Sequence, residues 1–361
     1  MEWIWPFGET GPEVRFAVAA AVVILAGVKL VQYGDALGGK LKLGQAWVGL
    51  VLLAAVTALP ELVTSIGAAT IHRPQIALGN VFGSILFNTM LIAVIDAAEG
   101  KGSLFLRVGR RLAIPIALAL VLLGVAACAI LAHTLVPNLR LGPVGPETPA
   151  ILLVYLVGVR VLKRAGAEEA DAESPPAGES GGGSTAAVAA KYGLAALAIL
   201  WAGLNLAGAA DAVAEEYEMG RTFVGVTLVA VTTSLPELTC TFAAARRGLV
   251  DMAVGNIFGS NAFNIVIIAV ADFFYPGSIV RGVVEAGSTR TQMIAVLFAA
   301  LTGAIVLVSL RLRVRRTVGR VAWPSLAIFV GYLAAAFLIY RVGGLPGGRG
   351  NGLPVRIGAT L

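Results

Sequence analysis

The sequence predicts an all-α polytopic membrane protein with ten transmembrane helices, arranged as two inverted five-helix repeats with broken helices at the membrane midplane. Three observations lead to this fold class. Apolar residues make up 58% of the 361 residues and charged residues only 13%, which lies outside the range of soluble domains. Several apolar runs reach the roughly 20 residues that cross a bilayer. The third observation is a long internal repeat without gaps.

The apolar runs predict ten spans, five on each side of a polar segment. The fifth span is short, and we expect its basic residues to extend to the membrane interface. The expected spans are 14–34, 44–70, 75–98, 111–133, 148–163, 187–214, 221–246, 251–275, 290–311 and 321–341. They give a first five-helix repeat over residues 1–164 and a second over residues 188–341.

The segment 165–187 differs in composition from both halves. It holds five acidic residues, a Pro-Pro pair and a Gly-Gly-Gly run, a composition that cannot bury a core. We therefore expect a flexible acidic linker; its acids could also sense a cation, although no rigid ligand loop is evident. The Gly- and Arg-rich residues 342–361 are expected to form a disordered tail.

The repeat aligns residues 35–96 with residues 211–272 at a constant offset of 176, and 26 of the 62 positions are identical. Because five spans is an odd number, the second copy should enter the membrane from the opposite side. The predicted spans place 17 basic residues on one side and nine on the other. The positive-inside rule then predicts outside N- and C-termini, a cytoplasmic linker and residence in the plasma or inner membrane. Inverted repeats with broken helices are typical of secondary transporters.

One motif occurs in both copies, as Leu59-Pro60-Glu61 and Leu235-Pro236-Glu237. A carboxylate within a membrane helix costs about 3 kcal/mol and usually marks a functional site. The proline cannot donate a backbone hydrogen bond, which interrupts the helix beside the carboxylate. Backbone oxygens at Ala54 and Val56, and at Ala230 and Thr232 in the second copy, should therefore be free to bind a ligand.

The polar residues around each motif share helix faces. Thr57 and Glu61 are four residues apart, as are Ser84 and Asn88 in the following span. The second copy repeats this spacing with Thr233, Glu237, Ser260 and Asn264. If the repeat axis brings these helices together, the carboxylates, amides and hydroxyls form an all-oxygen site that suits Ca²⁺ or Na⁺.

Other residues carry weaker signals. Zinc or copper would favour His or Cys ligands, but His72 and His133 are isolated near predicted span ends, so we assign them no role. The Gly-x-x-x-Gly pairs at 79–83 and 255–259 are expected to pack helices closely. Four aspartates lie near predicted span ends, where solvation is a simpler explanation than a gating role: Asp35, Asp211, Asp96 and Asp272.

At these positions the sequence resembles the cation/Ca²⁺ antiporter superfamily, and most closely a prokaryotic sodium/calcium exchanger. The resemblance rests on 57–61 with 79–88 and on 233–237 with 255–264, which match the family's Thr-Ser-Leu-Pro-Glu-like and Gly-Asn-rich segments. It implies that Ca²⁺ and Na⁺ are the transported ions and that no cofactor is needed. The ion ligands implied are Glu61, Glu237, Asn88, Asn264, Thr57, Thr233, Ser234, Ser84 and Ser260, with backbone oxygens of Ala54 and Ala230.

Two positions depart from the family pattern. Ala58 stands where many relatives have serine, and Asn264 stands where some microbial relatives have aspartate. The linker is also too short for the folded Ca²⁺-sensing domains of the animal exchangers.

We therefore expect a Na⁺/Ca²⁺ antiporter that works by alternating access, with both ions competing for one midplane site. A H⁺/Ca²⁺ antiporter is the nearest alternative, although its family usually carries a different glutamate motif. A cation channel would also use oxygens and acids but would not need inverted repeats. No nucleophile or cofactor motif indicates an enzyme. The expected partners are the ions and the lipid bilayer, with no nucleic acid and no obligate protein partner.

Overall fold

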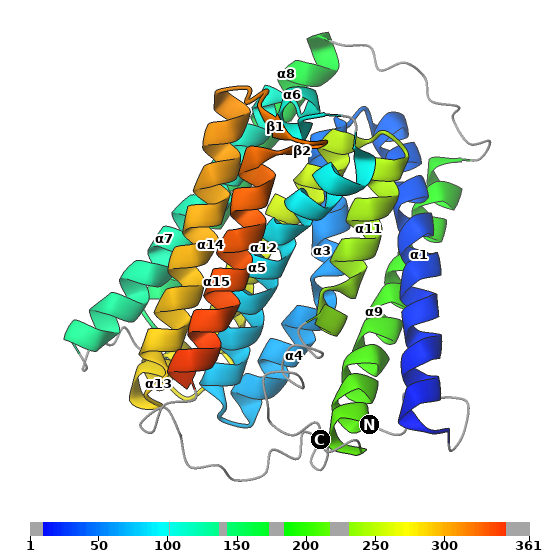
Figure 1. Ribbon diagram of the computed structural model, residues 1–361. Helices are drawn as coiled ribbons and strands as arrows, with labels where there is room; N and C mark the ends of the chain where they lie inside the picture. The colour runs from blue at the N-terminus through cyan, green and yellow to red at the C-terminus, as the bar shows by residue number, and fades with distance from the viewer. Residues whose placement is uncertain (1–9, 101, 137–142, 173–183, 217–230, 344–361) are drawn as a thin grey trace.

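The computed structural model describes residues 10–100, 102–136, 143–172, 184–216 and 231–343, and these are mostly helical (Figure 1). The described elements of the first half are α1 (Pro12–Leu41), α2 (Gln45–Trp47), the π-helix η2 (Val48–Leu53), α3 (Ala54–Thr57), α4 (Leu59–Thr70), α5 (Pro74–Glu99), α6 (Leu104–Arg107), the 3₁₀-helix η3 (Arg110–Leu112), α7 (Ala113–Leu135) and α8 (Glu147–Ala172).

The second half contains one long helix, a short broken segment, a buried helix and an outer pair. Its described elements are α9 (Thr185–Glu216), α11 (Leu235–Arg246), α12 (Val250–Asp272), α13 (Ile279–Glu285), α14 (Thr289–Arg311), strands β1 (Thr317–Val318) and β2 (Val321–Ala322), and α15 (Trp323–Gly343). The antiparallel pair β1–β2 precedes α15, so residues 321–322 are a strand and not, as predicted, the start of a span.

Seven helices in the described ranges are long and apolar enough to cross a membrane, and the bent pair 45–57 and 59–70 makes an eighth if it counts as one span. These eight correspond to eight of the ten predicted spans. The predicted fifth span lies in α8, which also carries Glu147 and three basic residues. The first part of the predicted seventh span, residues 221–230, lies outside the described residues, and the described remainder contains α11.

The segment between the halves is partly helical. Helix α8 continues to Ala172, so the flexible linker that we predicted from residue 165 is wrong over residues 165–172. Helix α9 begins at Thr185, three residues before the predicted repeat boundary at 188. The rest of the predicted linker, and the predicted tail from residue 344, lie outside the described residues.

Helices α5 and α12 form the centre of the bundle, and α1 and α9 run side by side along one edge (Figure 1). α12 packs directly on α2 and η2, because two glycines bring the backbones together. A β-carbon added to Gly255 would lie 2.7 Å from the carbonyl oxygen of Ala46, and one added to Gly259 would overlap the carbonyl of Leu50. The predicted packing role of this glycine pair is confirmed. For the pair 79–83 the prediction is wrong, because an added β-carbon would meet nothing within 4 Å at Gly83 and only the Gln292 side chain, at 3.6 Å, at Gly79.

Two repeat-related aspartates hold loops at opposite ends of the bundle. The carboxylate of Asp96 accepts backbone hydrogen bonds from Leu104 at 2.8 Å and Ala322 at 2.7 Å. Asp272 accepts bonds from the residues that precede or begin α13 and α8: Ile279 N at 2.6 Å, Gly145 N at 2.8 Å and Thr148 Oγ1 at 2.6 Å. Both aspartates are fully buried, so our expectation that these two are solvated near span ends is wrong. They fix loops instead.

His133 also has partners that the sequence did not indicate. Its Nε2 atom lies 3.0 Å from a carboxylate oxygen of Glu147 and 3.2 Å from the hydroxyl of Ser278. Ser278 in turn donates a short hydrogen bond to Glu147. All three side chains are buried, and they join the end of α7 to the starts of α8 and α13. The expectation that His133 is isolated is therefore wrong.

Replacing Gly259 with alanine is expected to lower the thermal unfolding midpoint of the detergent-solubilised protein. The new methyl group would overlap the backbone of η2, and overpacking of this kind costs about 1–3 kcal/mol. Gly124, in α7, is a matched control because nothing lies within 4 Å of an added β-carbon. Gly124→Ala should keep or raise the midpoint, since alanine favours a helix by about 1 kcal/mol. Equal midpoints for both variants would contradict the close packing of α12 on η2.

Candidate functional site

The two predicted helix breaks occur at equivalent positions. Ala58 interrupts the helix before α4, and Ser234 interrupts it before α11, each with ψ near zero (5° and 10°). These positions are 176 residues apart, the offset of the repeat. Pro60 and Pro236 then lie in the first turn, where a helix tolerates a missing N–H. The breaks predicted from the Leu-Pro-Glu motif are thus confirmed.

Each break places a glutamate in the first turn of a helix. Glu61 lies in the first turn of α4 and Glu237 in the first turn of α11, and both side chains are completely buried. The first turn carries free backbone N–H groups and the positive end of the helix dipole, which stabilise a negative charge. The fold therefore positions two carboxylates inside the bundle through the ends of two short helices.

The backbone before the first break is a π-helix, which the sequence did not predict. In η2 the regular hydrogen-bond pattern is widened, and the carbonyl of Leu52 accepts a 2.6 Å hydrogen bond from the hydroxyl of Tyr192 on α9. Single turns of π-helix are often found at functional sites. Here the turn also brings Gly49 against the backbone of Met252 on α12.

Glu61 is held by hydroxyls from both halves of the chain. Its Oε1 atom accepts hydrogen bonds from Ser84 at 3.4 Å and from Ser234 at 3.2 Å. The two serine oxygens are themselves 3.2 Å apart. Because Ser84 belongs to the first repeat and Ser234 to the second, this contact shows that the repeats meet at the predicted residues.

Glu237 has a different environment. Neither of its carboxylate oxygens has a hydrogen-bond partner of good geometry among the described residues. Thr57, Ser260 and the carboxylate of Glu61 are near enough to interact with it electrostatically. The residue equivalent to Ser234 is Ala58, which has no hydroxyl to offer. The difference between the repeats at this position thus coincides with the loss of a donor beside Glu237.

Thr57 links the first break to α12. Its hydroxyl lies 3.2 Å from Ser260 Oγ, 3.4 Å from Asn256 Oδ1 and 3.5 Å from the carbonyl oxygen of Ala54. The same carbonyl accepts a 3.1 Å bond from the N–H of Ala58. The Ala54 oxygen thus accepts from two donors, and our expectation that the break leaves it free is wrong.

Two asparagines missed by our site prediction support the broken helices. Asn80 donates to the backbone carbonyl of Glu61 at 3.3 Å and to Ser65 at 3.1 Å. Asn256 donates to Thr241, the repeat equivalent of Ser65, at 3.0 Å. The available signal was their identity in both copies of the repeat. Asn80 therefore connects the long helix α5 to the short helix α4, and Asn256 connects α12 to α11.

Asn88 and Asn264 are the remaining amides of the predicted site. Each lies one turn beyond Ser84 or Ser260 on the same helix face, and each is fully buried. Neither the amide oxygen nor the amide nitrogen of either residue has a hydrogen-bond partner among the described residues. A buried polar group without a partner normally costs about 1–3 kcal/mol, so these amides need an explanation.

A cation bound at this position would give the amide oxygens a partner. Five oxygens of the predicted ligand residues lie buried without a partner among the described residues, namely Glu61 Oε2, both carboxylate oxygens of Glu237, and the amide oxygens of Asn88 and Asn264. No lysine or arginine of the described residues forms an ion pair with either glutamate. Carboxylate, amide and hydroxyl oxygens are the ligands of Ca²⁺, and the donor set therefore fits a hard cation.

The structure places ten of the eleven predicted ligand residues. Thr233 and Ser234 are buried at the second break, and Thr57, Ser84 and Ser260 form the contacts described above. Ala230 lies outside the described residues. Within them, no group of three or more His, Cys, Asp or Glu side chains could hold a metal ion, so any ion here would rely on the amides and hydroxyls too.

Comparison with known proteins covers both halves of the chain. The profile of the family described as sodium/calcium exchanger protein matches residues 14–162 and 190–341. The chain is 29% identical over 321 residues to the putative antiporter CaxA of Alkalimonas amylolytica. This alignment covers 88% of this chain and 96% of the relative. A 59-residue stretch is 52% identical to the sodium/calcium exchanger MaX1 of Methanosarcina acetivorans, covering 16% of this chain and 17% of the relative.

The fold is also similar to a solved structure. The sodium-calcium exchanger NCX_Mj, soaked with Na⁺ and without Ca²⁺, superposes with a TM-score of 0.65 at 21% identity. The match covers 93% of this chain and 99% of that one. At this level of identity the likeness concerns the fold.

Replacing either buried glutamate with glutamine is expected to weaken Ca²⁺ binding by on the order of 100-fold or more. The change leaves a divalent cation with half of its neutralising charge in a medium of low dielectric constant. Equilibrium ⁴⁵Ca²⁺ binding to purified Glu61→Gln and Glu237→Gln measures the effect. Asp96→Asn is the control, because Asp96 is equally buried but binds only loop backbone. It should bind Ca²⁺ normally while its unfolding midpoint falls. Normal binding by either glutamine variant would contradict the site.

Proposed function

Since the chain belongs to the sodium/calcium exchanger family, we propose that it is a secondary antiporter that exchanges Na⁺ for Ca²⁺ across the membrane by alternating access. The observation that carries this proposal is the pair of fully buried glutamates that meet without a basic partner among the described residues. The transported ions are substrates, and the proposal needs no cofactor.

Charge balance explains why the two ions would exclude each other. With both glutamates ionised, the empty site carries two negative charges, which one Ca²⁺ or two Na⁺ can neutralise. Leaving such charges uncompensated in the interior costs several kcal/mol each. The protein would therefore release one ion only when the other is available, which is the requirement for coupled exchange.

The helices around the site suit a moving gate. An added β-carbon on Gly203 of α9 would lie 2.6 Å from the Pro60 ring, and one on Gly27 of α1 would lie 2.7 Å from the side chain of Thr239 on α11. Helices α1 and α9 therefore rest against the two broken segments with little side-chain bulk between them. We propose that α1 and α9 slide past the broken segments at these glycine contacts. We also propose that the whole chain forms ten transmembrane helices in two inverted repeats.

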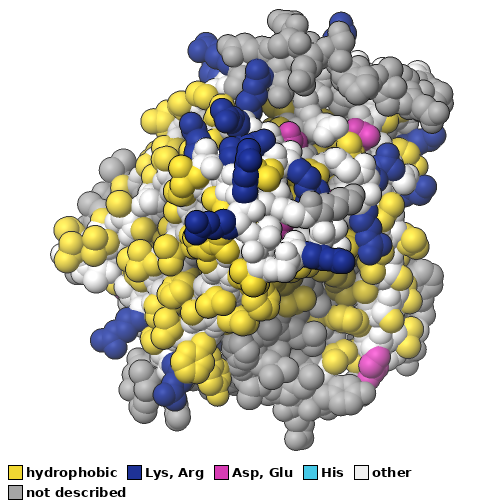
Figure 2. Space-filling view, turned by 45° about the horizontal axis from the view of Figure 1, so that its top comes forward, with side chains coloured by type: hydrophobic (Ala, Val, Ile, Leu, Met, Phe, Trp, Pro, Cys, Tyr) yellow, Lys and Arg dark blue, Asp and Glu magenta, His cyan; other side chains and the backbone are white. Residues whose placement is uncertain are grey.

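The distribution of charge supports an orientation. Figure 2 shows the upper face of the molecule, where lysine and arginine side chains gather near the ends of several helices. This face includes the turn between α14 and α15 and the C-terminal end of α1 (Figure 1). We propose that it faces the cytoplasm, which leaves the N-terminus outside.

A proton could replace Na⁺ as the counter-ion, and one observation favours this second candidate. Glu237 has no hydrogen-bond donor of good geometry among the described residues, and a proton would neutralise it as effectively as Na⁺ does. In that case Ca²⁺ would exchange for H⁺ at the same carboxylates.

Flux into proteoliposomes tests the proposed function. Vesicles loaded with Na⁺ and diluted into choline should accumulate ⁴⁵Ca²⁺, whereas vesicles with only a K⁺ or pH gradient should not. Glu61→Gln provides the background, and Asp96→Asn provides an active control of similar burial. Uptake driven by a pH gradient alone would favour the proton antiporter. Uptake without any counter-ion gradient would indicate a channel.

Cysteine labelling tests the orientation. In a background lacking Cys128 and Cys240, a cysteine at Thr10 should react with an impermeant maleimide from outside intact cells. A cysteine at Ser184, at the start of α9, should react only after the membrane is opened. Labelling of both positions from one side would contradict the odd number of spans between them.

A further inference from the structure

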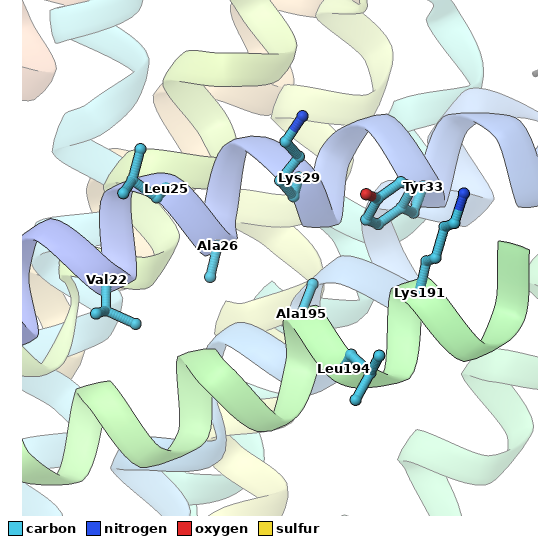
Figure 3. Close-up of a pocket in the computed structure, with 8 residues that line it drawn as sticks. All are labelled: Val22, Leu25, Ala26, Lys29, Tyr33, Lys191, Leu194 and Ala195. Atoms are coloured by element: carbon cyan, nitrogen blue, oxygen red, sulfur yellow. The ribbon is translucent and has the colours of Figure 1, made fainter.

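A groove on the outer surface of the bundle lies away from the ion site, between α1 and α9 (Figure 3). Its volume is about 380 Å³, within the usual range of sites for small molecules. Val22, Leu25 and Ala26 line it from α1, and Leu194 and Ala195 line it from α9. Leu25 and Leu194 are each 68% exposed, so the groove opens towards the surroundings of the bundle, which for these apolar helices is lipid.

Two lysines lie at one end of this apolar groove. Lys29 comes from α1 and Lys191 from α9, and Figure 3 shows Lys191 extending beside Tyr33. The ammonium group of Lys29 donates a 3.3 Å hydrogen bond to Gln32. No carboxylate of the described residues forms an ion pair with either lysine. The groove thus combines an apolar lining with two positive charges that form no ion pair within the described part of the chain.

The depth of the lysines matches a lipid headgroup region. The predicted apolar span of α1 ends at Gly34, five residues or about 7.5 Å beyond Lys29. The predicted span of α9 begins at Ala187, four residues or about 6 Å before Lys191. Lysine side chains of this length can reach the interface from such positions. The predicted spans thus place both charges towards the same membrane surface, on the side where the basic residues gather, while α1 itself continues to Leu41.

We propose that this groove binds one anionic phospholipid, with the headgroup phosphate between Lys29 and Lys191 and an acyl chain along Leu25 and Leu194. Charge complementarity selects the headgroup, and the apolar lining selects a lipid over a soluble anion. This site goes beyond the exchange function and does not depend on it.

The position of the groove gives the lipid a means to influence transport. Gly27, next to the groove residue Ala26, contacts α11 close to Glu237, and α9 contacts Pro60 through Gly203. A lipid that bridges α1 and α9 would hold together the two helices that lie against the broken segments.

Native mass spectrometry of the purified protein tests the site, with phosphatidylglycerol and phosphatidylcholine added in equal amounts. The wild type should retain phosphatidylglycerol preferentially. Each lysine close to an anionic lipid contributes about fivefold in binding, so Lys29→Gln or Lys191→Gln should lose about fivefold and the double variant about 30-fold. The double Lys→Arg variant should restore retention. Lys163→Gln, an exposed lysine on α8 outside the groove, should behave as wild type.

A second variant and a soluble competitor separate the lipid from a free anion. Leu194→Trp keeps both lysines but fills the groove, and it should also reduce retention. Inorganic phosphate at 10-fold excess over lipid should leave retention unchanged. The proposal is overturned if the double glutamine variant retains as much phosphatidylglycerol as wild type, if both lipids are retained equally, or if inorganic phosphate displaces the lipid. Because the readout is binding, loss of exchange activity alone would not affect it.

Discussion

Two carboxylates share one buried site inside a membrane protein, and much of the local structure follows from the need to tolerate them. Glu61 and Glu237 have no solvent exposure and no basic partner in the described part of the chain. An isolated charge in such a place costs several kcal/mol even after relaxation. The fold reduces this cost with helix N-termini and serine hydroxyls, but it leaves several oxygens without partners. In the proposed function, a bound cation would complete the site.

The internal repeat allows one solution to be used twice. Each half supplies a broken helix, a proline in the first turn, a glutamate and an asparagine that anchors the short helix. The repeat is not exact, because Ser234 donates to Glu61 whereas Ala58 can donate nothing to Glu237. The two carboxylates are therefore inequivalent, and Glu237 depends more on the ion for its stabilisation.

The sequence was most informative where a local rule had a direct physical cause. Proline at positions 60 and 236 predicts an interrupted helix, and the breaks lie two residues earlier in both copies. The apolar length of the spans predicts most of the long helices. The glycine pair at 255–259 predicts close packing because it removes side-chain volume where two backbones cross.

Features that depend on distant contacts could not be predicted in this way. In the π-helix η2, the carbonyl of Leu52 accepts a hydrogen bond from Tyr192, which lies 140 residues away in the sequence. His133 finds Glu147 and Ser278 only when three helix ends meet, so it looked isolated in the sequence. The aspartates at 96 and 272 looked solvated because most of their partners are backbone N–H groups of distant segments, which no side-chain pattern reveals.

Competition between the two ions at equilibrium tests the central claim most directly. Ca²⁺ binding to the purified protein would be measured at increasing Na⁺, with choline keeping the ionic strength constant. If two carboxylates are neutralised by either one Ca²⁺ or two Na⁺, the apparent Kd for Ca²⁺ should rise with a limiting log–log slope of about two, because two monovalent charges replace each divalent ion. The Ca²⁺ capacity should stay constant. An apparent Kd that is insensitive to Na⁺, or a capacity that falls at unchanged Kd, would contradict a shared site.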